Sequence, residues 1–339
     1  MKAWQIKAPL VIEETTRQDN IESVSSSKIK ITKALISDND AVAFIGNDEI
    51  KYPIIPGRNA VGIVTETGSN CFGIEKNDRV YINPVSSCNE CYNCKSGNKN
   101  SCIDVRIAGE NTEGFFRDFA VVPCSELFNL PDSVTDENAL FIEHISLAMA
   151  ITDKLNISKG EHVAVIGAST LGNILSQLII YYQGVPILID KDEINLDIAK
   201  KSGIYYTLKN DSQIIKNVSD LTGGRMTKKA IYITDCSLNT KLPLSLTCFG
   251  GSVAYAGFNP NSIKIDFATA MKKQLTVVGV IDGHCNTAAA INILVNKALN
   301  FSSFNFPTTA YSGIPKALAE KAKQIANGEK TTEVIVKLL

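Results

Sequence analysis

The fold is decided by the stretch His162-Val-Ala-Val-Ile-Gly167-Ala-Ser-Thr-Leu-Gly172. Its first five residues form a short, mostly apolar run, which is typical of a buried strand. The two glycines then predict a tight turn, and the apolar stretch at 173–183 predicts the helix that follows. A strand that runs directly into a helix indicates one unit of a parallel sheet with crossover helices.

The same pattern extends through the second half of the chain, whereas the first half is β-rich. From about residue 150, strand runs alternate with helical periodicity, and strands are predicted at 162–166, 185–189, 230–234 and 252–256. Short β-branched runs between turn residues predict earlier strands at 28–34, 60–66 and 78–82. A helix near 315–327 and a strand at 333–337 are expected to return to the first domain. The predicted fold class is α/β, with a β-rich domain and a doubly wound parallel-sheet domain.

The turn between the strand and the helix is a candidate site for a dinucleotide. A helix N-terminus presents unpaired N–H groups, which suit a pyrophosphate. In the usual G-x-G-x-x-G pattern the middle position is glycine, and this chain has Ser169 there, which is still small and adds a hydroxyl. The expected binding residues are Gly167, Ser169, Thr170, Leu171 and Gly172. The alternative is a nucleotide-free α/β domain in which the glycines only make the turn.

Asp190 lies 23 positions after Gly167 and closes the next predicted strand. A carboxylate at this place accepts hydrogen bonds from the adenosine ribose and repels a 2′-phosphate. This arrangement favours NAD over NADP as the cofactor. Lys191 follows at once and weakens the repulsion, so NADP stays the less favoured alternative.

Four cysteines are spaced closely in the stretch Cys88-Asn-Glu-Cys91-Tyr-Asn-Cys94-Lys-Ser-Gly-Asn-Lys-Asn-Ser-Cys102. Such spacing brings four thiolates to one tetrahedral ion and predicts a closed structural zinc site in a lobe at about 86–104. Cysteine count alone also permits an iron–sulfur cluster. The other five cysteines have no local partner spacing and are expected to be small buried apolar residues; they are Cys71, Cys124, Cys236, Cys248 and Cys285.

Length and composition limit the classes of partner. The chain has 339 residues, 45% of them hydrophobic and 20% charged, which suits two globular domains. A formal net charge of −1 gives no electrostatic drive toward nucleic acid or an anionic membrane. Because no signal-like segment and no apolar run of about 18 residues occurs, we expect a cytoplasmic protein. Its partners should be small molecules or further copies of itself.

These features resemble the medium-chain dehydrogenase/reductase superfamily, in particular its zinc-type alcohol, polyol and threonine dehydrogenase branch. Besides the cysteine loop and the glycine turn, the resemblance rests on Tyr52-Pro-Ile-Ile-Pro-Gly57-Arg-Asn-Ala-Val-Gly62, Asp78-Arg79-Val80 and Gly114-Phe-Phe-Arg-Asp-Phe-Ala120. It implies a GroES-like catalytic domain at 1–149, completed by 287–339, and a Rossmann domain at 150–286. It also implies a homodimer or homotetramer.

The chain departs from this family where the zinc-dependent members bind a catalytic zinc. The stretch that matches an early cysteine ligand has Ser37, and the family's Gly-His-Glu is Gly57-Arg58-Asn59. A permanent cation at the position of an imidazole ligand would repel Zn²⁺. Asn39 replaces the proton-relay hydroxyl, and a Glu-Pro motif becomes Glu143-His144. We therefore expect no catalytic zinc of the usual kind, and the competing hypothesis is a rearranged site built from Asp40, Glu143 and His144.

The predicted function is an NAD(H)-dependent oxidoreductase that transfers hydride between nicotinamide and a small alcohol or carbonyl compound. Arg58 is the candidate group to hold the substrate oxygen or a substrate anion, and Ser37, Asn39 and Asn59 are candidates to orient it. His144 or Glu143 is the candidate to move the proton. Two alternatives stay open: metal-free reduction of an activated C=C bond, and an inactive NAD-binding sensor or partner subunit. Arg58 can also be explained by an ordinary ion pair with Asp40 or Glu143.

Overall fold

The computed structural model describes residues 1–18, 21, 23–46, 50–236, 238–258, 263–329 and 331–338. Its contacts divide the chain into two compact units, one formed by Met1–Glu143 with Phe306–Leu339 and the other by His144–Asn305. The chain thus leaves the first unit and returns to it at its end. The return lies at Phe306, so residues 287–305, which we expected in the first domain, belong to the second unit.

The physical reason for this boundary is a set of contacts made by the segment after residue 287. The backbone N–H of Asn300 donates to Oε1 of Gln177 at 2.6 Å. The hydroxyls of Ser303 and Ser202 lie 2.6 Å apart. The segment is therefore tied to residues of the parallel-sheet unit before the chain turns back.

The first unit is built on a seven-stranded sheet with the order β16-β17-β3-β4-β5-β9, to which β8 adds by pairing with β3. Two small two-stranded sheets, β1-β2 and β6-β7, accompany it. Its strands are β1 (Lys2–Ala8), β2 (Val11–Thr16), β3 (Ser26–Ile36), β4 (Asn59–Thr67), β5 (Arg79–Ile82), β6 (Val85–Ser86), β7 (Arg106–Ile107), β8 (Phe119–Pro123), β9 (Leu127–Asn129), β16 (Thr308–Ala310) and β17 (Val334–Lys337). Its helices are α1 (Asp38–Ile45), α2 (Tyr92–Lys95), α3 (Asp136–Ala139) and α11 (Ile314–Ala326), with short 3₁₀ turns at Lys99–Ser101, Cys124–Glu126 and Tyr311–Gly313.

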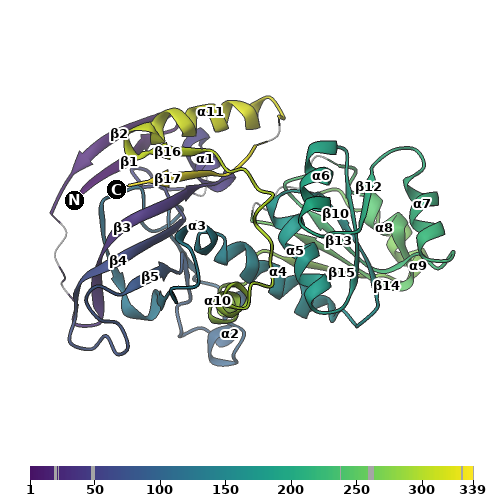
Figure 1. Cartoon of the computed structure of the whole chain (residues 1–339), viewed down its shortest axis with the longest axis horizontal. Coiled ribbons are helices and arrows are strands. Elements are labelled where there is room, and N and C mark those ends of the chain that lie inside the picture. Colours follow the sequence, from purple (N-terminus) through teal and green to yellow (C-terminus); the bar gives the residue numbers. More distant parts are fainter. Residues whose placement is uncertain are drawn as a thin grey trace. The chain divides into compact units, whose positions relative to one another are not determined.

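The C-terminal elements complete the first unit. Figure 1 shows β16, β17 and α11, in yellow, beside the N-terminal strands, in purple. Strand β17 pairs antiparallel with β3, so that Val336 lies opposite Ala34. Ile314 and Leu318 of α11 are buried in the same core as Ile29 and Ile31 of β3. The predicted return of the chain end is thus achieved by sheet pairing and by apolar burial.

The second unit is a six-stranded sheet in which every neighbouring pair is parallel. Its order, β12-β11-β10-β13-β14-β15, is the 3-2-1-4-5-6 order of a Rossmann fold when the strands are counted from β10. The strands are β10 (His162–Ile166), β11 (Val185–Asp190), β12 (Tyr206–Lys209), β13 (Thr227–Ile233), β14 (Thr247–Ala256) and β15 (Thr276–Val280). The helices are α4 (Ile142–Leu155, which begins in the first unit), α5 (Thr170–Tyr181), α6 (Glu193–Lys201), α7 (Ile214–Leu221), α8 (Leu242–Leu246), α9 (Phe267–Lys273) and α10 (Thr287–Val295), with a 3₁₀ turn at His284–Asn286. The predicted fold class is confirmed.

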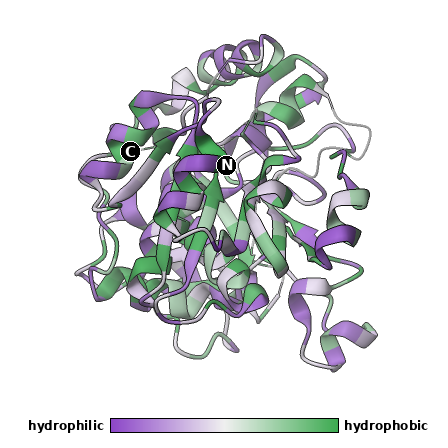
Figure 2. Cartoon of the chain, turned by 90° about the vertical axis from the view of Figure 1, so that its right-hand side faces the viewer, coloured by the Kyte–Doolittle hydropathy of each residue, from purple (hydrophilic) through white to green (hydrophobic). Residues whose placement is uncertain are grey.

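Apolar strands form the core of this second unit. Ala164, Ile166, Ile187, Ile189 and Val253 are all fully buried in one cluster. Figure 2 shows hydrophobic residues, in green, along the strands of the sheet. Such continuous apolar runs are expected when helices cover both faces of a parallel sheet. Among the helices in the described part of the chain, none is long and apolar enough to cross a membrane.

Candidate active site and metal centre

Arg58 lies at the centre of a buried polar cluster in the first unit. It directly precedes β4, and only 5% of the residue is exposed. Its Nε donates to Oε1 of Glu143 at 2.6 Å, and its Nη1 donates to Oε1 of Glu110 at 2.5 Å. Asn59 donates from Nδ2 to the other oxygen of Glu143 at 2.9 Å. The structure therefore brings together three of the predicted residues, Arg58, Asn59 and Glu143.

Two members of this cluster were not predicted, namely Glu110 and Tyr81. Glu110 lies in a short turn region with no motif of its own, so its charge next to Arg58 arises from the fold. The Tyr81 hydroxyl donates to Oδ1 of Asn59 at 3.3 Å. Burial, followed by the negative charge of Glu143, raises the pKa of Tyr81 well above its ordinary value. Tyr81 is therefore held as a neutral hydrogen-bond donor at any physiological pH.

The two carboxylates do not hold Arg58 equally. The Glu143 side chain is 8% exposed, whereas that of Glu110 is 32% exposed. Glu143 is also hydrogen-bonded by Asn59, which keeps its orientation fixed. A buried ion pair of this kind is stable only when its remaining polar atoms are satisfied. Glu143 is thus the buried partner of the guanidinium, and Glu110 is the partly exposed one.

Ser37 and Asp40, two further candidate site residues, are hydrogen-bonded to each other. The backbone N–H and the hydroxyl of Ser37 both donate to Oδ2 of Asp40, at 2.7 and 2.8 Å. The backbone N–H of Gly57 donates to the other oxygen, Oδ1, at 2.9 Å. Burial raises the pKa of Asp40, and these three donors oppose that shift. Asp40 therefore ties the start of α1 to the Gly57 turn, and both of its oxygens are engaged by protein donors.

This geometry counts against the rearranged zinc site. Both oxygens of Asp40 and both oxygens of Glu143 accept hydrogen bonds from the first unit itself. The bound guanidinium adds a positive charge that disfavours a divalent cation beside it. Asn39, a candidate to orient the substrate oxygen, is buried in the first turn of α1. His144 belongs to the second unit, where its ring packs edge to face against Phe258 with centroids 4.9 Å apart.

The four predicted zinc ligands do come together. The sulfur atoms of Cys88, Cys91, Cys94 and Cys102 all lie within 4.8 Å of one another. The Cys88 sulfur lies 3.9 Å from that of Cys94 and 3.5 Å from that of Cys102. A tetrahedral zinc with Zn–S bonds of about 2.3 Å requires sulfur atoms about 3.8 Å apart. The donor set fits one zinc ion.

The surrounding backbone favours the thiolate form that zinc requires. The N–H groups of Cys88 and Cys91 donate to sulfur atoms of this cluster, at 3.3 and 3.4 Å. Backbone N–H groups, first that of Ile103 and then that of Cys94, lower the pKa of Cys91 to about 6. With four sulfur ligands no coordination position is left for a substrate. The chemistry of this lobe is therefore structural.

Cys71 and Cys124 form a disulfide with Cα atoms 5.5 Å apart. Our expectation that both are isolated apolar cysteines was wrong. They are 53 positions apart in the sequence, and only the approach of the β8 end to the loop after β4 brings them together. No local spacing could have indicated the pair.

The predicted dinucleotide turn joins β10 to α5 in the second unit. Gly167 has a φ of +107°, a conformation that favours glycine, and a Cβ on Gly172 would lie 1.9 Å from the carbonyl oxygen of Gly167. The Ser169 hydroxyl oxygen accepts from the Gly172 N–H at 3.5 Å and so caps the helix. Thr170 and Leu171 open the first turn of α5. The N-terminus of α5 is thus positioned as a phosphate-binding turn requires, with Ser169 serving as the cap.

Asp190 ends β11, the strand next to β10, and it is only 6% exposed. Its oxygens accept from the backbone N–H groups of Ala168 at 2.6 Å and Asp192 at 2.9 Å. The carboxylate therefore links the two loops at the same edge of the sheet. Lys191 beside it is exposed.

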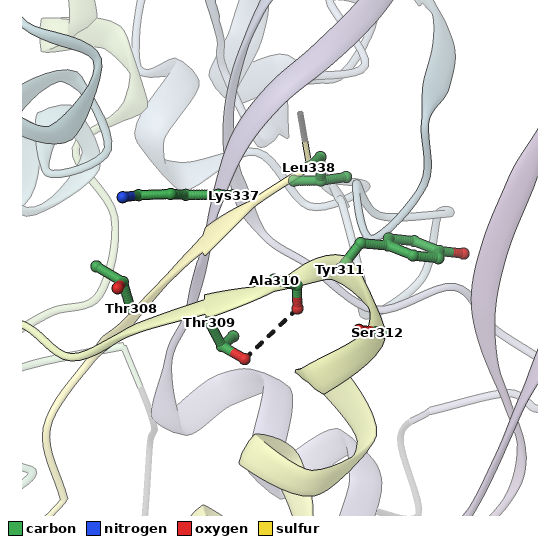
Figure 3. A pocket seen from close by; sticks show the side chains of 7 residues that line it. All are labelled: Thr308, Thr309, Ala310, Tyr311, Ser312, Lys337 and Leu338. Atoms are coloured by element: carbon green, nitrogen blue, oxygen red, sulfur yellow. Dashed lines mark hydrogen bonds between the residues drawn. The ribbon is translucent and has the colours of Figure 1, made fainter.

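The described residues of the first unit line a larger and a smaller hollow. The larger, of about 560 Å³, is lined by Thr308, Thr309, Ala310, Tyr311, Ser312, Lys337 and Leu338. Figure 3 shows these side chains around the edge strand β16 and the end of β17, and none is a predicted site residue. The smaller, of about 230 Å³, is lined by Lys51, Pro53, Ile54, Glu110, Asn111, Thr112 and Glu113. Glu110, which pairs with Arg58, thus also lines the smaller hollow.

Comparison with known proteins identifies the family. Residues 25–132 match the family model of the alcohol dehydrogenase GroES-like domain. The chain is 28% identical over 320 residues to the L-threonine 3-dehydrogenase of Pyrococcus abyssi, covering 91% of this chain and 90% of that protein.

Solved structures show the same fold along the whole chain. An alcohol dehydrogenase, rspB, from Escherichia coli CFT073 in complex with NADH has a TM-score of 0.87 and 22% identity, and the match covers 100% of this chain and 99% of that one. A zinc-binding dehydrogenase from Sinorhizobium meliloti 1021 bound to NADP has a TM-score of 0.89 and 19% identity over 99% of each chain. With its GroES-like domain, its Rossmann sheet and its four-cysteine lobe, the chain belongs to the medium-chain dehydrogenase/reductase superfamily of NAD(P)-dependent oxidoreductases.

Proposed function

We propose that the protein is an NAD(H)-dependent oxidoreductase that acts on a small alcohol or carbonyl compound without a catalytic zinc. The observation that carries this proposal is the buried Arg58, which pairs with Glu143 and Glu110. The resemblance of Gly57-Arg58-Asn59 to the family's Gly-His-Glu motif supports it, because it implies a histidine ligand at the place of Arg58 in zinc-type members. A positive guanidinium and a zinc ion cannot share this place. The electrophile for the substrate is therefore the guanidinium itself.

Glu110 is the exchangeable group in this scheme. Its side chain is partly exposed and lines the 230 Å³ hollow. Its Oε1 accepts a hydrogen bond from Nη1 of Arg58. A substrate oxygen that enters from the hollow would replace the Glu110 carboxylate on that nitrogen, while Glu143 keeps the guanidinium in place. Because Arg58 stays charged at all relevant pH values, it can stabilise negative charge on that oxygen throughout the reaction. When bound, the nicotinamide supplies or accepts the hydride.

The cofactor proposed is NAD(H), held by the turn at Gly167–Gly172, with Asp190 on the ribose side. The buried carboxylate of Asp190 at the end of β11 supports this choice, because it disfavours a 2′-phosphate. The second proposed cofactor is one structural zinc ion, bound by the four cysteines of the lobe. In tests of cofactor preference, Asp190→Ala should raise the affinity for NADPH relative to NADH, and an unchanged ratio would contradict the role of Asp190.

A second candidate function is supported by the same cluster. The Arg58 guanidinium is already engaged by two protein carboxylates, as expected if the protein binds NAD(H) but performs no reaction and serves as a sensor or partner subunit. Reduction of an activated C=C bond is the third possibility, because it needs no metal to polarise oxygen. Turnover assays distinguish the three.

The first experiment is the zinc content of the purified protein per chain, determined beside a Cys88→Ser/Cys91→Ser variant. We expect about one zinc in the parent and none in the variant, since four thiolates bind one ion. Two zinc ions in the parent, with one retained in the variant, would contradict the metal-free mechanism.

The second experiment follows NADH oxidation with panels of carbonyl and enone substrates in the parent, in Arg58→Lys and Arg58→Ala, and in Arg106→Lys as a control at an exposed arginine of β7. We expect the Arg58 variants to lose about 100-fold or more in kcat/KM, as for removal of an oxyanion-binding donor, while NADH binding persists. Arg106→Lys should be unaffected. NADH binding without turnover in the parent would favour the sensor.

We also propose that the protein forms a homodimer or homotetramer through the second unit. Strand β15 ends the sheet order and has a hydrogen-bonded neighbour on one side, β14. Large apolar side chains are exposed close to it in the chain, at Phe267, Met271 and Ile281. An open edge flanked by exposed apolar side chains suits pairing with a second copy.

A further inference from the structure

The loop that follows β15 gathers a carboxylate, an imidazole and a thiol that the proposed reaction does not use. Nδ1 of His284 lies 2.5 Å from Oδ2 of Asp282, and Nε2 of the same ring lies 3.7 Å from the sulfur of Cys285. The backbone N–H of His284 also donates to Asp282, at 2.9 Å from Oδ1. The three groups therefore lie in the order carboxylate, imidazole, thiol.

The loop backbone keeps this arrangement in place. A Cβ on Gly283 would lie 2.1 Å from the carbonyl oxygen of Ser146, so the chain passes α4 at a distance that only glycine allows. The Asn286 side chain donates to the same carbonyl at 3.4 Å. Thr287 donates from its hydroxyl to the carbonyl of His284 at 2.8 Å. The His284 ring is thus carried on a closely packed backbone.

The three side chains differ in their exposure to solvent. The side chains of His284 and Asp282 are 8% and 16% exposed. Cys285, by contrast, is exposed. The base and the group that orients it are shielded, while the nucleophile faces solvent and is open to a reagent.

The hydrogen bonds determine which ring nitrogen carries the proton. An ionised Asp282 can only accept, so Nδ1 of His284 is the protonated nitrogen. In the neutral ring Nε2 then has a lone pair, and this is the atom that faces the Cys285 sulfur. A base that lies beside a nucleophile and is oriented by a third group is the arrangement that activates cysteine nucleophiles.

From this geometry we infer that Cys285 is an activated thiol that undergoes thiol–disulfide exchange with low-molecular-weight disulfides. The Cys285 S–H proton passes to Nε2 of His284. The resulting thiolate attacks one sulfur of the disulfide, so that a new S–S bond forms at Cys285 and the old S–S bond breaks. The departing thiolate takes the proton from Nε2, which leaves His284 neutral and one small thiol released. Asp282 acts as a positioning residue that keeps Nε2 aimed at the sulfur.

The other thiols of the second unit offer a contrast. Burial raises the pKa of Cys236 to about 12, so that thiol is protonated and shielded at neutral pH. Cys248 is half-buried within β14. Reaction with a small disulfide should therefore occur first at Cys285.

The test uses the zinc-loaded full-length protein with glutathione disulfide as the probe, and peptide mass mapping to locate and time the mixed disulfide between pH 6 and 9. We expect a single early adduct on Cys285, none in Cys285→Ser, and an unchanged rate in Cys248→Ser. His284→Gln should slow the reaction at pH 7 about tenfold, because the thiolate fraction falls tenfold for each unit of thiol pKa. Asp282→Asn should move the midpoint of the pH profile upward.

Two results would overturn the inference. One is an early adduct on Cys248 or on the cysteine lobe in place of Cys285. The other is a wild-type pH profile whose midpoint equals the pKa of about 8.5 of an ordinary cysteine. This second readout needs no variant, so it decides the matter even if His284→Gln lowers the melting temperature.

Discussion

At the residue scale, Arg58 shows how carboxylates accommodate a buried positive charge. A buried arginine is tolerated because Glu143 and Glu110 both accept from it. The cluster counts one positive and two negative charges, so a single negative charge remains, and the partly exposed Glu110 carries it most easily. A buried guanidinium is therefore compatible with this cluster because carboxylates lie on two sides of it.

Glu143→Gln is expected to destabilise the protein by about 3 kcal/mol, because removal of one partner of a buried ion pair leaves the other poorly compensated. The loss of unfolding free energy should lie at the lower end of the usual range, because Glu110 still pairs with Arg58. The control is Glu66→Gln, which removes the partner of Lys28 from a pair whose Glu66 side chain is 62% exposed. That loss should stay below about 1 kcal/mol. Urea unfolding of both variants measures the difference, and equal losses would contradict the buried pair.

Asp40→Asn tests the buried carboxylate through its pH dependence. The folded-state pKa of Asp40 is raised by burial, so the folded protein binds this proton more tightly than the unfolded chain does. The stability that Asp40 contributes is therefore present below its unfolded pKa and is lost as the pH rises through the folded pKa.

The loss of stability caused by Asp40→Asn should accordingly grow as the pH is lowered from 8 to 5. Comparing the two proteins at each pH cancels the other titrating groups. The measurement is the urea midpoint of both at pH 8 and pH 5, and a difference that shrinks at pH 5 would show that the carboxylate is stabilised in its charged form.

At the scale of elements, the strand–turn–helix unit from β10 to α5 is tightly packed at a single glycine. Gly172→Ala places a Cβ against the carbonyl oxygen of Gly167, at 1.9 Å before relaxation, so the turn must shift. We expect a loss of NADH affinity of at least tenfold and a lower melting temperature. Gly279→Ala on β15 is the matched control, because a Cβ there meets nothing within 4 Å. NADH titration of both variants is the measurement, and an unaffected Gly172→Ala would refute the phosphate-turn assignment.

The observed strand boundaries show which parts of a strand the sequence pattern predicts and which it misses. The strand predicted at 162–166 is β10 (His162–Ile166) itself, and the one at 185–189 lacks only the final Asp190 of β11. By contrast, β14 begins at Thr247, five residues before the predicted start at Ser252. The added segment contains Phe249-Gly250-Gly251, and the register with β13 shifts there. Glycines and an irregular ladder hide this part of the strand from any period-two pattern.

At the scale of the whole molecule, the proposed assembly through β15, which ends the described sheet order, can be tested by substitution. Val278→Lys places a charge in β15, which is expected to convert an oligomer to a monomer. Tyr205→Lys is the control, because Tyr205 lies next to β12 at the opposite edge and is 85% exposed. Light scattering after gel filtration gives the mass of each. Dissociation by Tyr205→Lys but not by Val278→Lys would place the interface at the other edge.

The sequence by itself determined what depends on local spacing. Strand runs, the glycine turn and the four cysteines of one short loop are all contained in segments of fewer than about 20 residues, so their geometry follows from nearby residues. The family resemblance rests on the same stretches, and the comparisons bear it out.

Only the tertiary structure decided the contacts between distant segments. Arg58 meets Glu110 and Glu143 across 52 and 85 positions, and Cys71 meets Cys124 across 53. Which distant side chains meet depends on how β3, β4 and the loops between them close on one another, and no local pattern encodes that closure. For the same reason the sequence did not indicate that Asp40 ties α1 to Gly57: its partners are set by sheet closure, and its burial by the core around it.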